Sequence, residues 1–477
     1  MCTIMPPAII TTPGGAMDDT IRYNNAKTWQ IGFFSLNNAA TNLHFTLFSL
    51  YFLVYCTEVW KLNPVLVGTI MMVSRLFDAF TDPMIGYIID KTDTRFGRFR
   101  PYMVLGSLII NISLVAMFWG IRFESQVYTL LWLSLWYFIW VIGYTFQTII
   151  TKAGQVVLSN NPAQRPLFVG FDGVFTTLVF IIISAGTNPI LLNFGGTENP
   201  TGWRVVTAIL ILLNVTLTIL AVIGLRAKDR KEFFIENTET RRVGLRAFLA
   251  VIKGNRALQM LVAAASTNKL ASVTQNAALV YFFMYVMNDL SLQSTVLPIV
   301  GLCGVVGAVT AMVIAVRTSN RTAFVFGTWT SIISLAALVI FRPFSPELLP
   351  VAIVMFGIMA FFGGIANNII LVMIPDTADY ETWSTGRFIP GMISTTFSFT
   401  DKAVSALGGL LVGLALGGYK SGMAMTPRLY WGILFAFLGV PLLGHIASAV
   451  AMKWYPITRA FYESMIKEIS TREKRAV

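Results

Sequence analysis

Charged residues are scarce in this sequence of 477 residues: they make up 12% of the chain, while 55% of the residues are hydrophobic. Soluble globular domains contain roughly 25% charged residues, and so few charges cannot cover a water-facing surface of this size. The composition excludes a soluble enzyme, a disulfide scaffold, a coiled coil and a disordered chain. Because a membrane-spanning helix needs about 20 apolar residues, the chain has enough of them for about a dozen spans.

Cysteine and histidine are also rare. The three cysteines match no metal-binding or redox spacing, and two histidines are too few for a histidine-rich metal site. No nucleotide-binding glycine loop and no Ser/His/Asp arrangement stands out, so we expect neither an enzyme nor a cofactor. Residues 1–29 lack the pattern of a cleaved signal peptide, and the first apolar run should therefore remain as a membrane helix.

Apolar runs of membrane-spanning length recur along the chain, separated by Gly, Pro or charge clusters. They fall near 31–56, 64–89, 102–121, 127–150, 167–192 and 205–225, and again near 257–287, 295–316, 323–341, 349–374, 391–418 and 429–452. This pattern predicts an all-α membrane protein with twelve transmembrane helices in two six-helix bundles. The predicted parts are an N-terminal segment (1–29), a first bundle (30–225), a charged linker (226–256), a second bundle (257–452) and a tail (453–477).

Lysine and arginine are distributed unevenly over the predicted loops. When the loops are placed alternately on the two sides, 26 of these residues fall on the side of residue 1 and 6 on the other. Because basic loops stay on the cytoplasmic side of a membrane, both termini are predicted to be cytoplasmic. The same distribution explains the net charge of +12 without any bound nucleic acid.

Three charged residues lie inside the predicted second span: Arg75, Asp78 and Asp82. An ionisable group at membrane depth costs at least about 2.5 kcal/mol, so such residues indicate function. Helical spacing puts Asp78 and Asp82 on one face, with the hydroxyl of Thr81 beside them. Two carboxylates on one face can bind a cation such as sodium or can share a proton. The alternative is that Arg75 only neutralises Asp78 as a structural pair.

Aromatic and polar residues follow one another at a spacing of four along the predicted fourth span. The series begins with three tryptophans and continues with Tyr144, Thr148 and Lys152. An aromatic face beside polar groups suits the apolar face of a sugar ring, so these three residues are candidates for a substrate cavity. Alternatively, the aromatic residues pack between helices or anchor at the membrane interface, and Lys152 is a loop cation.

Lys402 lies inside the predicted eleventh span, next to Asp401. A lysine at this depth requires a carboxylate or water. Neighbouring residues on a helix point about 100° apart, so Asp401 need not be the partner. The acidic pair of the second span is the other candidate.

Several motifs resemble one family of membrane transporters. The basic, glycine-containing loop after the second span (86–101) is similar to the loop signature of the major facilitator superfamily. Together with Asp-Ala-Phe-Thr-Asp-Pro (78–83), it resembles the glycoside–pentoside–hexuronide cation symporters, the family of the melibiose permease. The segments 376–381, 386–387 and 398–402 resemble that family's loop before helix eleven and the helix itself.

The resemblance implies a cation site on helix two. Asp78 and Asp82 would bind the cation, as metal ligands if it is sodium, with Thr81 and Thr145 as possible oxygen ligands and Lys402 nearby. Coupling or gating residues would then be Arg75, Lys402, Asp379 and the loop arginines Arg95, Arg98 and Arg100. These three arginines would make contacts between helix ends that close the cytoplasmic side.

The substrate site departs from the melibiose permease pattern. Asn42 and Thr148 stand where acidic sugar-binding residues would fall, and Gly173 stands where a sugar-contacting arginine would be. Fewer acids, with Lys152 retained, would suit an anionic sugar such as a hexuronide, although neutral glycosides stay possible. The expected substrate-binding residues are Asn42, Tyr144, Thr148, Lys152 and Ser398.

The resemblance therefore implies an inner-membrane transporter that imports a glycoside or hexuronide together with a cation, by alternating access. Its partners would be a small sugar, sodium or a proton, and the lipid bilayer. The alternative function is a carrier of amphipathic lipids or drugs on the same fold.

Overall fold

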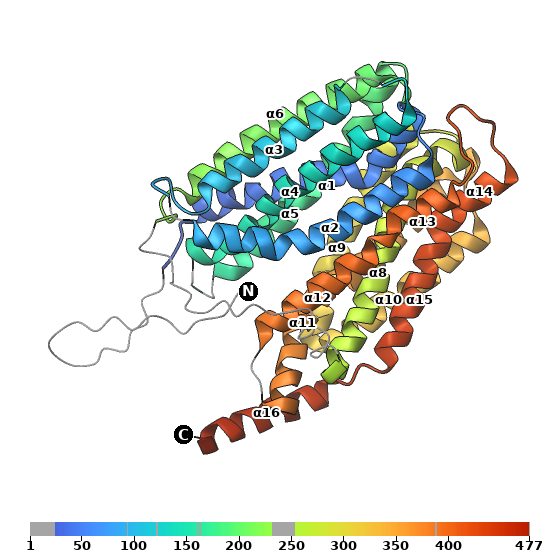
Figure 1. The fold of residues 1–477 in the computed structure, drawn as a ribbon. Coiled ribbons are helices and arrows are strands. Elements are labelled where there is room, and N and C mark those ends of the chain that lie inside the picture. The colour runs from blue at the N-terminus through green and yellow to red at the C-terminus, as the bar shows by residue number, and fades with distance from the viewer. Residues whose placement is uncertain are drawn as a thin grey trace.

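The computed structural model describes residues 24–92, 94–120, 123–159, 161, 164–230, 253–386 and 389–476, and these residues are almost entirely helical. The helices form two bundles, one from each half of the chain (Figure 1). The all-α class is therefore confirmed. The N-terminal residues before 24 and most of the predicted linker (231–252) lie outside the described residues.

The first half contains the six helices expected from its apolar runs. They are α1 (Thr28–Glu58), α2 (Pro64–Lys91), α3 (Arg100–Phe118), α4 (Gln126–Leu158), α5 (Arg165–Asn193) and α6 (Pro200–Leu225). Local sequence explains two of the helix starts. Asn63 and Asn199 each accept a hydrogen bond from a backbone amide two residues on, and a proline occupies the first position of each helix.

The second half is more broken than its apolar runs suggest. Its elements are α8 (Arg256–Tyr281) with η3 (Phe282–Val286), α9 (Ser291–Arg317), α10 (Asn320–Phe341), η4 (Pro346–Leu348), α11 (Leu349–Thr385), α12 (Pro390–Ser405), α13 (Leu407–Ala415), α14 (Pro427–Leu434), η5 (Phe435–Gly439), α15 (Val440–Lys453) and α16 (Arg459–Ala476). The predicted span 391–418 is divided between α12 and α13, just before a pair of glycines. The predicted span 429–452 contains the π-helical turn η5. The predicted tail includes helix α16.

In the described part of the chain, eleven helices are long and apolar enough to cross a membrane. Helix α8, which corresponds to the predicted seventh span, is 26 residues long but is not among them. It carries several polar side chains, including Asn268, Lys269 and Gln275. The count of twelve spans, the cytoplasmic termini and the domain boundaries therefore remain predictions.

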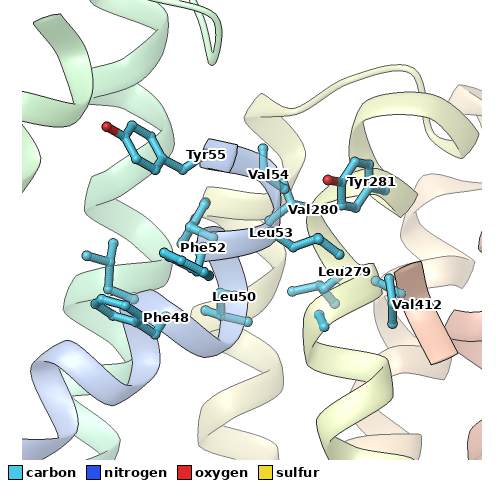
Figure 2. Packing of buried hydrophobic residues seen from close by; sticks show 14 of the residues in the cluster. Phe48, Leu50, Phe52, Leu53, Val54, Tyr55, Leu279, Val280, Tyr281 and Val412 are labelled. Atoms are coloured by element: carbon cyan, nitrogen blue, oxygen red, sulfur yellow. The ribbon is translucent and has the colours of Figure 1, made fainter. Parts of the chain in front are cut away.

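Buried hydrophobic residues form three clusters that reveal how the two halves meet. One cluster draws residues from both halves, whereas the other two belong to the second half and the first half separately. Figure 2 shows part of the shared cluster, with Leu53 and Val54 of α1 beside Leu279 and Val280 of α8 and Val412 of α13. The two halves thus share a core at one end and have separate cores at the other.

We call the end with the shared core, where α2 begins at Pro64, the closed end. Here α2 and α13 approach so closely that a Cβ atom on Gly68 would lie 2.5 Å from the backbone oxygen of Gly409. A Cβ on Gly413 would likewise lie 2.5 Å from the oxygen of Pro64. Only glycine permits such an approach. At the opposite, open end, where α16 lies, the two bundles diverge (Figure 1).

Candidate functional site

Lys402 joins the two halves of the molecule through the carboxylates of α2. Its Nζ lies 2.9 Å from Oδ2 of Asp78 and 2.6 Å from Oδ2 of Asp82. The two aspartates therefore lie on one face of α2, as their spacing predicts, and they are the carboxylate partners of Lys402. Because α2 belongs to the first half and α12 to the second, these ion pairs cross between the bundles.

Asp78 is the better enclosed of the two acids, with a side chain that is 1% exposed. Its Oδ1 accepts a hydrogen bond from the Thr145 hydroxyl of α4 at 3.0 Å, and Arg75 lies 3.3 Å from its Oδ2. Thr81 donates to the backbone oxygen of Asp78 and lies 3.4 Å from the Thr145 hydroxyl. The four residues that the resemblance assigns to the cation site are thus brought together, with Arg75 and Lys402 adjacent to them.

Asp82 faces a wetter environment, because its side chain is 34% exposed. It is one helical turn closer to the open end than Asp78. Asp82 is therefore the acid that solvent from the open end contacts. Its Oδ1 is shielded from solvent and accepts no hydrogen bond from any described residue. A buried oxygen without a donor can accept a proton or a cation ligand bond.

The charges at this site balance formally, with two carboxylates facing Lys402 and Arg75. The guanidinium of Arg75 also lies 4.7 Å from the centre of the Phe45 ring of α1, which holds it by a cation–π contact. The structural-pair interpretation accounts for Arg75 and Asp78. It does not account for Asp82, whose contact is to Lys402 from the other half.

Aromatic residues close the space beside Arg75. Tyr144 stacks on Phe45 and on Trp140, with ring centroids 5.7 and 5.3 Å apart, and Trp140 stacks on Phe48 at 4.2 Å. The cavity between this stack, Arg75 and α13 encloses about 40 Å³. Small-molecule sites usually enclose about 300–1,000 Å³, so this cavity has room for a few water molecules but not for a sugar. The aromatic stack therefore seals the site toward the closed end.

The other predicted substrate residues lie on the same helices without a shared contact. Asn42 donates to Asn38 within α1, and Thr148 donates to the backbone oxygen of Thr145 within α4. Lys152 is exposed, two turns along α4 from Tyr144 toward the open end. Ser398 lies on α12 one turn before Lys402. Their roles in binding substrate remain predictions.

The other predicted gating residues, the three loop arginines and Asp379, make contacts within their own halves. The backbone amides of Arg98 and Arg100 donate to the Asp229 carboxylate, and Arg100 forms an ion pair with it at 3.3 Å. These bonds tie the start of α3 to the end of α6. Arg95 lies in the exposed loop before α3, over the Phe96 ring. In the second half, Asp379 accepts a hydrogen bond from Tyr462 of α16 at 3.1 Å.

A polar network at the closed end was not predicted from the sequence. Glu58, at the end of α1, is 2% exposed and accepts hydrogen bonds from Tyr419 and, at 2.7 Å, from Ser421. Beside it, Thr57 and Tyr281 of α8 share a hydrogen bond of 2.6 Å. These bonds link the first half to the second. The one sequence signal for them is an acidic residue directly after a long apolar run.

Comparisons with known proteins show which family the chain belongs to. The family model described as MFS/sugar transport protein matches residues 33–459. The chain is 26% identical over 457 residues to the glucuronide carrier protein homolog of Escherichia coli (strain K12), covering 94% of this chain and 97% of that protein. It is 27% identical to the isoprimeverose transporter of Lactiplantibacillus pentosus, over 92% of this chain and 91% of that protein.

Solved structures show the same fold. A mutant of the nucleoside transporter NupG superimposes with a TM-score of 0.66 at 14% identity, covering 89% of this chain and 99% of that one. At this identity the likeness concerns the fold alone. The family model, by contrast, covers most of the chain and includes every residue of the carboxylate site. The chain therefore belongs to the MFS/sugar transport protein family and is a multi-pass membrane transporter.

Proposed function

We propose that the protein is a symporter of the bacterial inner membrane that imports a glycoside or hexuronide together with a monovalent cation or a proton. The observation that carries this proposal is the bridge from Lys402 to Asp78 and Asp82. This ionic contact joins α2 of the first half to α12 of the second, and α12 also carries the proposed substrate residue Ser398. Any cation that competes for these carboxylates must therefore change how the halves are held together.

In the proposed mechanism, the coupling cation and the Lys402 ammonium compete for the same carboxylate oxygens. A cation bound by Asp78, Asp82 and the hydroxyls of Thr81 and Thr145 would release Lys402 from α2. Release would let the halves rock and expose the site to the other side of the membrane. If the cation favours the sugar-binding state, the sugar must favour cation binding by the same factor.

The substrate is proposed to be a hexuronide or a neutral glycoside, and the residues of the site favour the anionic sugar. Lys152 supplies a positive charge on α4 toward the open end, and Asn42 and Thr148 are neutral residues where acidic sugar-binding residues would fall. The relative named as a glucuronide carrier homolog supports a hexuronide, and the isoprimeverose transporter supports a neutral glycoside. Tyr144 and Ser398 complete the proposed substrate contacts. The family match favours a sugar over the amphipathic-lipid or drug alternative.

The proposed orientation puts both termini and the open end in the cytoplasm, with twelve helices crossing the membrane. The excess of Lys and Arg in the loops on that side supports it. The arrangement described here would then be the inward-facing state. Arg95, Arg98, Arg100 and Asp379 lie at the open end, where contacts between the halves would form when the transporter turns outward.

Transport by purified protein in proteoliposomes tests the proposal. A panel of labelled glucuronides and neutral glycosides is supplied under a sodium gradient and, separately, under a proton gradient. Accumulation of one sugar above its external concentration under one gradient is the expected result, and it identifies both partners. Equal uptake with and without gradients would reject coupling, and no uptake of any sugar by folded protein would reject the substrate class.

A further inference from the structure

A second polar site lies at the open end of the second half, away from the carboxylates of α2. It is a cavity of about 420 Å³ that is wide open to the surface, at the junction of the end of α9, the start of α10 and the start of α16. Its lining consists of Arg317, Thr318, Ser319, Arg321, Thr322, Thr458 and Arg459. Three of these seven residues are arginines and the others carry hydroxyl groups. In the described part of the chain, no acidic residue lines this cavity.

Two helices begin at this cavity. The Ser319 hydroxyl accepts the amide of Thr322 at 3.1 Å and caps α10, and the Thr458 hydroxyl accepts the amide of Phe461 at 3.3 Å and caps α16. Each capping hydroxyl satisfies one amide, and the other amides of the first turn have no acceptor within the helix. The positive ends of two helix dipoles therefore add to the charge of the arginines.

Arg321 and Arg317 have side-chain donors that form no hydrogen bond to a described residue. Arg321 donates to the backbone oxygen of Met452 at 3.3 Å, but its Nε is buried and has no acceptor among the described residues. The Arg317 side chain is exposed and forms no ion pair or hydrogen bond with any residue of the described ranges. A guanidinium donor without an acceptor in the chain can be satisfied by water or by an anion.

Arg459 holds the cavity together. Its guanidinium donates to the backbone oxygens of Arg317 and Thr318 at 3.2 and 3.1 Å, which neutralises the carboxyl end of α9. It also pairs with Glu463 at 3.1 Å, and both side chains of this pair are mostly exposed. The other nearby acid, Asp376, accepts a hydrogen bond from Asn320 at 3.0 Å. The acids at the rim thus have partners, and an excess of positive charge remains.

Large exposed apolar side chains lie close in sequence to the residues that line the cavity. Val316, directly before Arg317, is 83% exposed, and Trp454, four residues before Thr458, is 51% exposed. In a multi-pass membrane protein such residues face lipid, and tryptophan favours the level of the lipid head groups. The arginines therefore lie at the depth where lipid phosphates are found.

We propose that this cavity binds a phosphate group, held by Arg317, Arg321 and the first amides of α10 and α16. The neighbouring apolar surface favours an anionic phospholipid as the source of the phosphate, and a soluble phosphate has the same chemistry. Arginine matches phosphate geometry with two parallel hydrogen bonds, and helix amino ends bind phosphate through their free amides. A bound phosphate would join α9, α10 and α16 at the membrane surface.

Native mass spectrometry of delipidated protein tests the proposal. The full-length protein is titrated with cardiolipin, phosphatidylglycerol and phosphatidylcholine, and inorganic phosphate is titrated separately by calorimetry. We expect cardiolipin or phosphatidylglycerol to bind at least tenfold more tightly than phosphatidylcholine. The Arg317→Gln and Arg321→Gln variants should each lose most of that preference. Lys453→Gln, which removes a basic residue outside the cavity lining at the same end, should keep it.

The two sources of phosphate give different results. Binding of inorganic phosphate that both arginine variants weaken, without a preference among lipids, would assign the site to a soluble phosphate. Unchanged affinities for lipids and phosphate in folded Arg317→Gln protein would overturn the proposal, and so would an equal loss in Lys453→Gln. The side chain of Arg317 forms no bond to a described residue, so Arg317→Gln should fold. This variant therefore gives a result even if Arg321→Gln does not fold.

Discussion

The ammonium of Lys402 occupies the position between Asp78 and Asp82 that a coupling cation would use in the proposed mechanism. Removing it would leave the buried carboxylate of Asp78 close to the partly exposed carboxylate of Asp82, and two such neighbours cannot both readily stay ionised. The lysine therefore allows the halves to remain in contact when no cation is bound. Cation binding and release of this contact are then one event.

Substituting Thr145 tests whether its hydroxyl contributes to cation binding or whether the side chain only packs. Replacing Thr145 with Val keeps its shape but removes the hydrogen bond to Asp78 Oδ1. Losing a hydrogen bond to a charged group costs about 1.5 kcal/mol, which corresponds to roughly a tenfold weaker apparent affinity for the coupling cation. The affinity is measured from the cation dependence of sugar uptake.

Thr148 provides a matched control on the same helix, because it donates to a backbone oxygen of α4 and not to either aspartate. At saturating sugar, Thr148→Val should leave the cation affinity within about twofold of the wild type, and Thr145→Ser should regain the affinity that Thr145→Val loses. Equal losses of cation affinity in Thr145→Val and Thr148→Val would show that Thr145 has no special role.

The residue-level chemistry could be predicted from the sequence only where a charge stands out. Asp78, Asp82 and Lys402 are conspicuous because apolar residues surround them, and so their pairing could be anticipated. Glu58 and Asp229 lie at the ends of apolar runs, where charged residues are ordinary. Their partners, Tyr419 and the amides at the start of α3, are far away in sequence, so only the folded structure reveals them.

At the scale of helices, the end of α1 is fastened to the loop after α13. Glu58 is buried there and accepts hydrogen bonds from Tyr419 and Ser421. Burial raises the pKa of Tyr419, and the neighbouring Glu58 raises it further, so the tyrosine stays protonated and remains a donor. Glu198 also accepts from Ser421, but its side chain is 55% exposed.

Replacing Glu58 with Ala should loosen the closed end. Two hydroxyls lose a charged acceptor, so the balance between closed and open forms of this end should shift by about 2 kcal/mol. Glu198→Ala is the matched control, and because exposed ion pairs contribute less than about 1 kcal/mol, its effect should be smaller. The shift is measured as the accessibility of the region around Tyr281 to a fluorescence quencher. A larger effect from Glu198→Ala would contradict this assignment.

Protonation gives a related expectation for Glu198. A hydrogen bond from Lys61 holds the pKa of Glu198 below its usual value of 4.5. A lowered pKa in the folded state means that its stabilisation is present above that usual value and is lost as the pH falls through the lowered pKa. Between pH 6 and pH 8 the Lys61–Glu198 pair should therefore make no pH-dependent contribution to closure, as a comparison of wild type and Glu198→Gln can check.

The packing of α2 against α13 depends on glycine. Gly68→Ala would put a methyl group into the backbone of Gly409, so we expect the closed end to open and sugar uptake to fall several-fold. Gly86 lies near the other end of the same helix with no atom within 4 Å of an added Cβ. Gly86→Ala should therefore leave the closed end intact. Normal uptake and normal closure in Gly68→Ala would show that this contact is dispensable.

Helix positions were largely predictable, but helix interruptions were not. The apolar runs of the first half correspond to α1–α6 because lipid requires continuous apolar helices. The separation of α12 from α13, and the π turn in the last span, are not visible in the apolar runs, which continue through both. The polar helix α8 is buried by other helices rather than by lipid, and hydropathy therefore describes it poorly.

On the scale of the whole molecule, the halves share a core at one end and have separate cores at the other. Alternating access predicts that these two ends exchange roles. Spin labels at residues 124 and 347 report the closed end, and labels at 227 and 453 report the open end. When sugar and its coupling cation are added, the distance between the labels at 124 and 347 should lengthen and the distance between the labels at 227 and 453 should shorten. Both distances are measured by double electron–electron resonance.

Opposite changes at the two ends are the essential outcome of that experiment. If both distances lengthened or shortened together, the molecule would be breathing as a whole and not rocking about a central site. The architecture of two bundles was predictable from the apolar runs and the polar linker. The direction in which the halves open was not, because it depends on contacts between residues from different halves.

The most direct test of cation coupling through α2 compares wild type with Asp82→Asn in the same proteoliposomes. Gradient-driven accumulation of sugar is measured beside the exchange of labelled for unlabelled sugar without a gradient. The proposed mechanism predicts that Asp82→Asn loses accumulation while retaining exchange, because Lys402 and Asp78 still hold the site together. Full accumulation by Asp82→Asn, with unchanged cation dependence, would contradict it.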